Sequence, residues 1–552
     1  MNGAGSGDSG LPVEESIAAI RAALAGDARA AVLQAPPGAG KTTVVPLRLL
    51  DEEWLAGAKI VMLEPRRLAT RAAARRMAAT LGDDVGATVG YVTRDDRRVG
   101  AATRIEVVTE GILTRRLQRD PALGGTGLVI FDEFHERNLN ADLGLALALD
   151  ARRSIRPDLR VLVMSATLDS ERVATLVGPD TPVVTSEGRQ HPIDIRWRPS
   201  PGRVRVEAAT DDAVRRALRE EHGDVLVFLP GAAEIRRTAE LLAGAALPGD
   251  VDVRPLYGGL PVDEQDAAIA PSPAGRRKVV LSTDIAETSL TVEGVRVVVD
   301  AGLARVPRFD ARTGLTRLQT VSASKASVDQ RAGRAGRTEP GVVFRLWSKL
   351  EQAARRPYSD PEITQVDLAG FALELAAWGV RDVADLPLLD PPPPRTLAEG
   401  RELLRELGAV DAEGRITDDG RTIAELPLHP RLARMVLVSA TREREAWEAC
   451  LVAALLEDRD VLRGHPDELP VDIVDRLVML VDPGRRHPRL DGRALRSARD
   501  RAHDIARRAG VTPGDVDLSA AGRVLALAYP DRIAAQPAGG RGRFTLRSGS
   551  AA

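Results

Sequence analysis

The sequence predicts an α/β protein with two consecutive parallel-sheet domains, followed by a mainly α-helical region. Up to about residue 347, short β-branched runs alternate with longer stretches of helical period, which is typical of parallel sheets with right-handed crossovers. After Trp347 the strand signals thin out and amphipathic helices dominate. The chain of 552 residues is several times longer than a typical domain of about 150 residues, so several domains are expected.

The candidate elements fall into three groups along the chain. Strands of the first domain are expected at Ala30–Leu33, Ile60–Leu63, Ile105–Val108, Leu128–Phe131 and Val161–Met164. Strands of the second are expected at Val225–Leu229, Val279–Leu281, Val295–Val299 and Val342–Leu346, with the junction near Ser186–Pro192. Later helices are expected at Leu368–Trp378, Leu397–Leu407, Pro430–Thr441 and Trp447–Leu456, with a proline stop at Pro391–Pro394.

Composition narrows the class of protein. Hydrophobic residues make up 44% and charged residues 28%, which is ordinary for a globular protein and too apolar for a disordered one. Apolar stretches such as Leu143–Leu149 are far shorter than the roughly 20 residues of a membrane span. Met1–Gly10 lacks the features of a signal peptide, and the single cysteine, Cys450, excludes an internal disulfide and a Cys-based zinc site. We therefore expect a cytoplasmic protein with no membrane association.

The charge balance argues against a broadly basic nucleic-acid binder. The net charge is −2, so a nucleic-acid site has to be a local basic channel. Only five of the 77 basic residues are lysines, which fits a bias toward arginine across the chain and makes a surface arginine uninformative. One of the five, Lys41, stands in the strongest motif of the sequence.

A phosphate-binding loop is predicted at Ala35-Pro-Pro-Gly-Ala-Gly-Lys-Thr-Thr43, between a strand and a helix. Small residues let backbone N–H groups surround a β-phosphate at a helix N-terminus. Lys41 is expected to reach the β- and γ-phosphates of ATP, and the Thr42 hydroxyl to bind Mg²⁺. The predicted nucleotide-binding residues of this loop are Gly38, Ala39, Gly40, Lys41, Thr42 and Thr43.

The acidic partner of this loop is predicted in Val129-Ile-Phe-Asp-Glu-Phe-His-Glu136. The apolar run places Asp132 at the carboxyl end of a strand, where α/β sheets bind their ligands. Asp132 is expected to hold Mg²⁺, and Glu133 to polarise the attacking water. His135 is open to a structural or a coupling role.

With these motifs the chain resembles the DEAH-box helicases of superfamily two, and further segments resemble that family in order. They are Glu64-Pro-Arg-Arg-Leu68 (motif Ia), Val92-Thr-Arg94 with Thr109-Glu-Gly111, Ser165-Ala-Thr167 (motif III), Val227-Phe-Leu-Pro230 (motif IV), Ser282–Ser289 (motif V) and Gln330–Arg337 (motif VI). Phe134 stands where the box has Ala, and Asp284 where motif V often has Asn. The resemblance implies two RecA-like domains that bind ATP between them.

The resemblance also implies roles for individual residues. Arg334 and Arg337 are expected to act as arginine fingers, Gln330 to position water or the γ-phosphate, and Arg76 to stack on adenine. The opposite face of the base falls near Ile269, which offers no aromatic ring. His135, Ser165 and Thr167 are expected to relay cleft closure, and Arg66, Arg67, Thr109, Thr283 and Thr288 to contact nucleic acid. Arg305–Ser324 is expected to form a β-hairpin that acts as a wedge or strand guide.

The C-terminal half also resembles this family, with the closest likeness to the bacterial HrpB-type helicases. The domains expected are a flexible N-terminus at 1–16, RecA-like domains at 17–187 and 188–350, a winged-helix-like domain at 351–428 and a helical ratchet-like domain at 429–520. Residues 521–552 are expected to begin a C-terminal region that is cut short.

The resemblance implies ATP-driven 3′→5′ movement on single-stranded nucleic acid, expected to be RNA, with duplex unwinding. Three alternatives remain open on the sequence: a DNA-directed helicase, a nucleotide-switched RNA-binding ATPase that does not unwind, and a non-hydrolysing scaffold. The residues separate RNA from DNA poorly, because backbone contacts say little about the sugar. A protein activator is common in the family, and the sequence identifies none.

Overall fold

The computed structural model divides the chain into two compact units. One contains Met1–Val366 with Ala384–Pro392, and the other Asp367–Val383 with Pro393–Ala552. The structure describes residues 10–94, 96–166, 169–188, 191–200, 204–244, 247–287, 290, 292–310, 315–457, 459–464, 466–482, 484–536 and 544–547. Within these residues, no helix is both long and apolar enough to cross a membrane.

The described residues of the first domain form an eight-stranded sheet in the order β4-β3-β5-β2-β6-β7-β1-β8, parallel except at the β3–β4 edge. The strands are β1 (Ala30–Gln34), β2 (Lys59–Leu63), β3 (Val89–Val92), β4 (Arg97–Arg98), β5 (Ile105–Val108), β6 (Thr126–Phe131), β7 (Arg160–Ser165) and β8 (Val183–Thr185). The helices are α1 (Glu14–Ala25), α2 (Lys41–Arg48), α3 (Arg67–Leu81), α4 (Glu110–Arg119), α5 (Leu139–Ser154) and α6 (Ser170–Val177).

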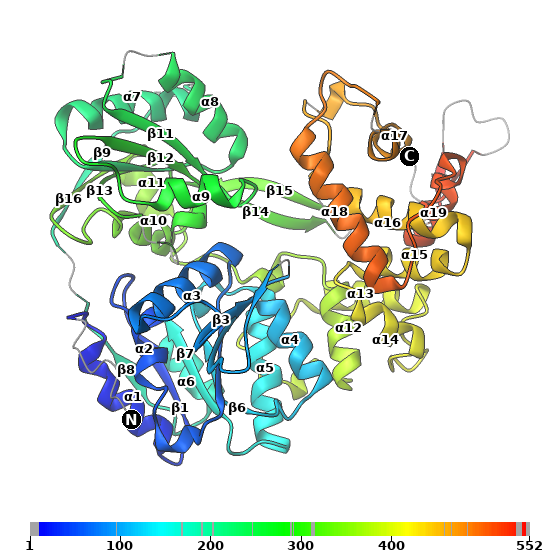
Figure 1. The fold of residues 1–552 in the computed structure, drawn as a ribbon, viewed down its shortest axis with the longest axis horizontal. Coiled ribbons are helices and arrows are strands. Elements are labelled where there is room, and N and C mark those ends of the chain that lie inside the picture. The colour runs from blue at the N-terminus through cyan, green and yellow to red at the C-terminus, as the bar shows by residue number, and fades with distance from the viewer. Residues whose placement is uncertain are drawn as a thin grey trace. The chain divides into compact units, whose positions relative to one another are not determined.

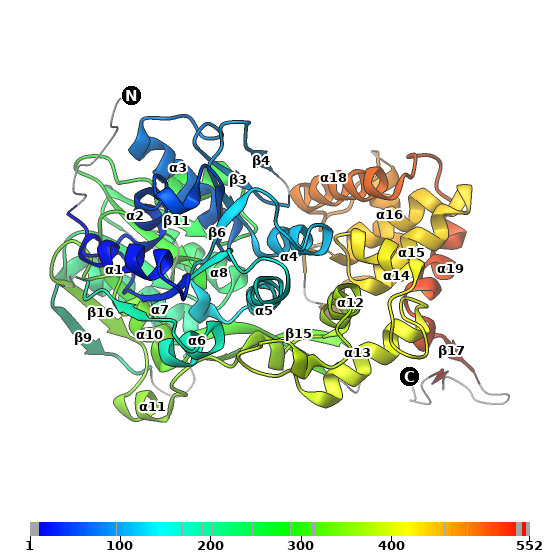
Figure 2. The ribbon, with the colours of Figure 1, turned by 90° about the horizontal axis from the view of Figure 1, so that it is seen from below.

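Successive side chains of each strand point to opposite faces of this sheet. Met62 and Ile130 pack in the apolar cluster that α1, α2 and α3 cover. On the other face, Leu63 and Phe131 approach Gly144 of α5. The sheet is therefore a central layer between two layers of helices (Figures 1 and 2), and the carboxyl ends of β1, β6 and β7 meet along one edge.

The second domain is built on a parallel sheet in the order β11-β12-β10-β13-β16-β9. Its strands are β9 (Ile193–Trp197), β10 (Asp224–Phe228), β11 (Val251–Leu256), β12 (Arg277–Ser282), β13 (Val295–Asp300) and β16 (Gly341–Arg345). Its helices are α7 (Val206–Glu220), α8 (Ala232–Ala243), α9 (Val262–Ile269), α10 (Lys325–Ala332) and α11 (Lys349–Ala354). Helices α7 and α8 cover one face, and α9 and α10 pack on the other.

A separate antiparallel hairpin lies between β13 and α10 in the chain. Strand β14 (Leu303–Asp310) pairs with β15 (Leu315–Ser322), in agreement with the hairpin expected at Arg305–Ser324. Residues 311–314 at the predicted turn lie outside the described residues.

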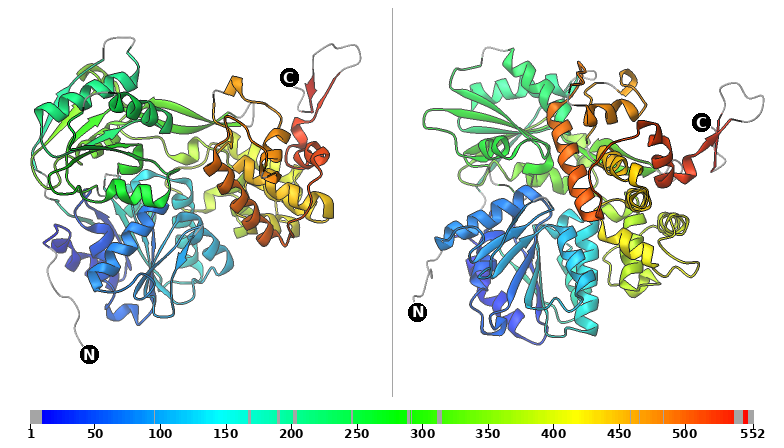
Figure 3. Two further views of the ribbon diagram at one scale, coloured as in Figure 1. Left: turned by 45° about the horizontal axis from the view of Figure 1, so that its top comes forward. Right: turned by 45° about the vertical axis from the view of Figure 1, so that its right-hand side comes forward.

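The second unit is mainly helical, as expected. Its helices are α12 (Ala369–Trp378), α13 (Pro394–Glu406), α14 (Asp418–Glu425), α15 (Pro430–Ala440), α16 (Glu443–Glu457), α17 (Val474–Val481), α18 (Gly492–Ala509) and α19 (Ala521–Ala528), with a short pair β17 (Ala534–Ala535) and β18 (Thr545–Leu546). Helix α16 lies at the centre, where it packs against α15, α18 and α19 (Figure 3). The proline run ends at Pro394, the first residue of α13, where the missing N–H costs nothing.

Two expected boundaries differ from the structure. Residues 10–16 pack on the first domain and are not a flexible end, because Val13 is fully buried and α1 already begins at Glu14. The compact first unit runs on to Val366, beyond the expected boundary at 350, because hydrogen bonds tie the segment after α11 to that unit.

Candidate functional site

The phosphate-binding loop has the geometry that its sequence predicts. Strand β1 ends at Gln34, the chain turns through Ala35–Gly40, and α2 begins at Lys41. Gly38 has φ +89° and Gly40 has φ +97°, a left-handed conformation in which a side chain is strained. Both glycines are therefore required by the backbone path. Thr43 lies in the first turn of α2.

Lys41, Thr42 and the acidic pair converge below this loop. The Lys41 ammonium lies 3.2 Å from Asp132 Oδ1 and 2.7 Å from Glu133 Oε2, and all three side chains are buried. The Thr42 hydroxyl donates to Asp132 Oδ2 at 2.5 Å. Burial disfavours the charged amine, but the two carboxylates outweigh it, so the pKa of Lys41 lies above its usual value.

This donor set fits a Mg²⁺–nucleotide. A hydroxyl and a carboxylate oxygen side by side are the hard ligands that Mg²⁺ takes. One ammonium faces two carboxylates in this buried cluster, so a divalent cation would add positive charge beside them. Lys41 is also placed to meet phosphate oxygens at the N-terminus of α2.

The backbone after Asp132 is held in an unusual conformation. Glu133 has φ +50° and Arg137 has φ +51°, and a 3₁₀ turn over Phe134–Glu136 lies between them. The Glu133 N–H donates to Asp132 Oδ1 at 2.8 Å. Left-handed residues without glycine are uncommon and cluster at functional sites, so the strain marks this turn as one whose geometry is specified.

His135 joins this turn to the segment after β7. Its Nδ1 accepts a hydrogen bond from the backbone N–H of Ala166 at 3.2 Å, next to Ser165 at the end of β7. Burial, and then the charge of Lys41, lower the pKa of His135 to about 3, so the ring is neutral and can accept. Thr167, the third expected coupling residue, lies outside the described residues.

The two expected arginine fingers differ in their surroundings. Arg337 lies beside the phosphate-binding loop, with its Nε 3.6 Å from the position a Cβ on Gly38 would take. Burial lowers its pKa to about 10, while Glu133 acts in the opposite direction. Arg334 instead donates to the backbone carbonyls of Glu287 and Leu290, within and just after motif V. Burial, and then Arg337, put the pKa of Arg334 well below its usual value.

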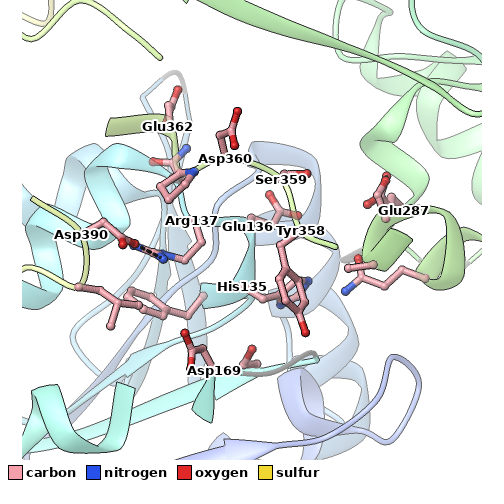
Figure 4. A pocket seen from close by; sticks show the side chains of 18 of the residues that line it. His135, Glu136, Arg137, Asp169, Glu287, Tyr358, Ser359, Asp360, Glu362 and Asp390 are labelled. Carbon is pink, nitrogen blue, oxygen red and sulfur yellow. Dashed lines mark hydrogen bonds and ion pairs between the residues drawn. The ribbon is translucent and has the colours of Figure 1, made fainter. Parts of the chain in front are cut away.

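Gln330 lines a cavity of about 510 Å³. His135 and Ser165 line the same cavity, together with residues that follow α11 (Figure 4). The side-chain nitrogen of Gln330 is buried and makes no hydrogen bond to the described residues. Gln330, which lies on α10, therefore lines the same cavity as two of the expected coupling residues, His135 and Ser165.

The residues expected to contact nucleic acid fall into two groups, those at the start of a helix or turn and one that forms ion pairs. Arg67 is exposed at the first residue of α3, Thr109 is the N-cap of α4, and Thr283 precedes a 3₁₀ turn. Helix N-termini present free N–H groups to phosphates. Arg66 instead pairs with Glu136 and with Asp284 of the second domain, each at 3.2 Å. Thr288 lies outside the described residues.

The expected adenine-stacking residue is not in contact with this cluster. Arg76 is exposed on α3, and it is the neighbouring Arg75 that pairs with Asp266 of α9, at 3.0 Å. Sequence reasoning also missed two acidic residues. Glu287 receives hydrogen bonds from Ser327 and Arg331, and Glu362 receives one from the N–H of Leu139. Glu287 lies within the predicted motif V, but Ser327 is 40 positions away from it, and Leu139 is 223 positions from Glu362, so no local pattern signals either contact.

Known proteins resemble the chain along nearly its whole length. Residues 15–176 match the DEAD/DEAH box helicase model, 209–339 the helicase conserved C-terminal domain, and 401–428 the winged-helix helicase-associated domain HA2. ATP-dependent RNA helicase HrpB of Escherichia coli is 46% identical over 99% of this chain, and the chain covers 64% of that relative. ATP-dependent RNA helicase HrpA of E. coli is 36% identical over 84% of the chain, which covers 35% of it.

Solved structures agree with this relationship. A crystal structure of the E. coli DEAH/RHA helicase HrpB superposes with a TM-score of 0.85 at 45% identity, covering 98% of this chain and 66% of that one. A second, described as the E. coli DExH-box NTPase HrpB, gives a TM-score of 0.80. The chain therefore spans about two thirds of the HrpB relatives it matches. From its motifs, its two parallel-sheet domains and this identity, the chain belongs to the DEAH-box helicases and is of the HrpB type.

Proposed function

We propose that this chain couples ATP hydrolysis to 3′→5′ movement on single-stranded RNA and to the unwinding of duplexes. The observation that supports it most is the buried convergence of Lys41, Thr42, Asp132 and Glu133 beneath the phosphate-binding loop. The two E. coli relatives that are 46% and 36% identical to this chain are named ATP-dependent RNA helicases.

Lys41, with the backbone of Gly38–Gly40, binds the β- and γ-phosphates of ATP. Thr42 and Asp132 hold Mg²⁺ with the two oxygens that already share a hydrogen bond. When bound, Mg²⁺ neutralises phosphate charge, and ATP supplies the phosphoryl group that water accepts. The two adjacent carboxylates have different contacts, since Asp132 accepts from Thr42 and Glu133 pairs with Lys41. Asp132 therefore serves the metal, and Glu133 serves the water.

Glu133 orients the attacking water and accepts its proton. The left-handed backbone at this residue aims the carboxylate toward Lys41 and the loop. Arg337 stabilises negative charge on the γ-phosphate from beside Gly38, with Arg334 as the second finger. Gln330 positions water or phosphate after the domains close, and Arg76 packs on the base.

Single-stranded RNA is held through its phosphates. Arg67, Thr109 and Thr283, with Arg66 and Thr288, supply contacts that carry no sequence information, as a translocating enzyme requires. The hydrogen bond from Ala166 to His135 connects the acidic box to motif III. Closure of the nucleotide site is relayed along this link through Ser165 and Thr167. We also propose a cytoplasmic location, which the single cysteine supports.

Steady-state ATP hydrolysis with no polymer, with single-stranded RNA and with single-stranded DNA tests this function, using Glu133→Gln as the blank. Stimulation by RNA above that by DNA is expected. Equal stimulation by both polymers contradicts the RNA assignment, and a basal rate that neither polymer raises contradicts coupling to nucleic acid.

A further inference from the structure

A short segment after α11 connects the acidic box to the hairpin. Residues 359–366, here called the connecting segment, contain a single 3₁₀ turn over Glu362–Thr364. The turn is closed by hydrogen bonds from Thr364 N–H to Pro361 O and from the N–H groups of Gln365 and Val366 to Glu362 O. Ile363 is fully buried beneath it. The segment is therefore compact and anchored.

Glu362 holds one end of this segment to the acidic box through two hydrogen bonds. Its Oε2 accepts from the Leu139 N–H at 2.7 Å, and its own N–H donates to Arg137 O at 3.0 Å. Leu139 is the first residue of α5, where an N–H has no partner within the helix and a carboxylate is favourable. Figure 4 shows Glu362 above Arg137 at the rim of the cavity.

Arg137 is itself tightly positioned. Its guanidinium pairs with Asp390 at 2.7 Å (Figure 4) and with Asp142 at 3.0 Å. Its backbone is the second left-handed residue of the box. Glu133 and Arg137 lie at the two ends of one 3₁₀ turn. A displacement of Arg137 is therefore passed to the turn that carries the proposed base.

The other end of the connecting segment holds the hairpin. The Phe309 N–H of β14 donates to Gln365 O at 2.7 Å. Pro307, two residues earlier in the same strand, shows that this edge accommodates a residue without an N–H. Only two residues thus separate the contact to the acidic box, at Glu362, from the contact to the hairpin, at Gln365.

We propose that Glu362 is a positioning residue that couples the acidic box to the β14–β15 hairpin through the connecting segment. It acts by fixing Arg137 and α5 against the hairpin. This inference rests on the proposed function, because it concerns how much unwinding each hydrolysed ATP yields.

The test measures base pairs unwound per ATP hydrolysed in one reaction, with a partial RNA duplex as substrate. Glu362→Ala removes the acceptor for Leu139 and is expected to lower this ratio about threefold or more, the scale of known coupling mutations. Glu362→Gln keeps an acceptor oxygen and is expected to restore the wild-type ratio. If Glu362 had a merely structural role, its loss would lower the rate of unwinding and the rate of ATP hydrolysis together and leave their ratio unchanged.

A second pair of variants tests the hairpin end. Phe309→Pro removes the N–H that reaches Gln365, whereas Phe309→Ala removes the ring and keeps the N–H. We expect Phe309→Pro to lower the ratio and Phe309→Ala to keep it. Asp360→Ala is the control within the segment, because its carboxylate pairs with Arg356 and not with the acidic box.

The outcomes are distinguishable. A wild-type ratio in both Glu362→Ala and Phe309→Pro overturns this inference and leaves the proposed function in place. If Glu362→Ala does not fold, the comparison of Phe309→Pro with Phe309→Ala decides. A wild-type protein that hydrolyses ATP without RNA stimulation overturns the proposed function, and this inference with it.

Discussion

At the scale of single residues, the site depends on buried charges that constrain one another. Lys41 is the shared partner of Asp132 and Glu133, and removing one member of such a buried group leaves the others uncompensated. Substitutions that preserve shape are therefore the informative ones, because they separate the chemistry from the fold.

Glu133→Gln preserves the shape of the side chain and removes its capacity to accept a proton. We expect the turnover number for ATP to fall by about 10²–10⁴-fold, which is the usual contribution of a general base. The melting temperature and nucleotide binding should stay near those of the wild type, measured by thermal unfolding and by equilibrium binding. Near-normal turnover in this variant contradicts the assignment of Glu133.

Arg337→Ala and Arg334→Ala should both slow hydrolysis, by about 10³-fold or more if each acts as an arginine finger. They should differ in stability. Arg334 satisfies the carbonyls of Glu287 and Leu290, so its loss leaves buried acceptors unpaired and lowers the free energy of unfolding by about 1–3 kcal/mol.

Denaturation of the two arginine variants side by side checks this difference. Arg337→Ala is the comparison variant, because the Arg337 guanidinium lies beside Gly38 of the phosphate-binding loop. An equal loss of stability in both variants would contradict the distinct surroundings described for them.

At the scale of elements, the phosphate-binding loop is supported by the segment before α1. The Val13 N–H donates to Ala39 O at 3.1 Å. Leu11 Cδ1 lies 2.9 Å from the position of a Cβ on Gly40, which is closer than real Cβ contacts allow. The loop is thus held between α2 and the chain that precedes α1.

Gly40→Ala should destabilise the first domain and weaken nucleotide binding, because it adds backbone strain and a clash with Leu11. Gly57→Ala is the matched control. Gly57 also has a left-handed backbone (φ +81°), but no atom lies within 4 Å of the added Cβ. We expect Gly57→Ala to cost the backbone strain of about 1–2 kcal/mol and Gly40→Ala to cost more. Equal melting temperatures for the two variants would contradict the packing of Leu11 on the loop.

Helix α16 carries a buried carboxyl group whose titration opposes folding. Neither oxygen of Glu448 makes a hydrogen bond to the described residues. Burial, and then the charges of Asp517 and Glu445, raise its pKa from 4.5 to about 7. Between these two values the unfolded chain loses the proton while the folded chain keeps it, so this group's contribution to stability falls as the pH rises.

Glu448→Gln removes this titration. Relative to the wild type, the variant should gain about 1–3 kcal/mol in free energy of unfolding between pH 4.5 and pH 8, since no buried charge has to form. Denaturant unfolding of both proteins at pH 5 and pH 8 checks it. A stability difference that does not change with pH would contradict the raised pKa.

The central strands of the second sheet could be predicted from the sequence, and its edge strands could not. Strands such as β10 and β13 are buried on both faces and give continuous apolar runs, whereas β9 and β11 mix polar and apolar residues and give no such signal. The acidic box and the phosphate-binding loop are local motifs, so their residues were predicted. Glu362 was not, because its partner Leu139 is 223 positions away.

At the scale of the whole molecule, many arginines of this arginine-rich chain form ion pairs with carboxylates. Arg66, Arg137, Arg172 and Arg331 each contact carboxylates within their unit. The 79 acidic residues balance the 77 basic ones, which gives the net charge of −2. Under the proposed function, nucleic acid is therefore expected to contact local sites such as the N-termini of α3 and α4, where free N–H groups can meet phosphates.

The central claim is that ATP hydrolysis drives 3′→5′ movement on RNA. The most direct measurement compares unwinding of two RNA duplexes of the same sequence, one with a 3′ single-stranded tail and one with a 5′ tail, while ATP hydrolysis is recorded. The account predicts ATP-dependent unwinding of the 3′-tailed duplex, little unwinding of the 5′-tailed duplex, and none by Glu133→Gln. Equal unwinding of both duplexes, or hydrolysis with no unwinding of either, would contradict it.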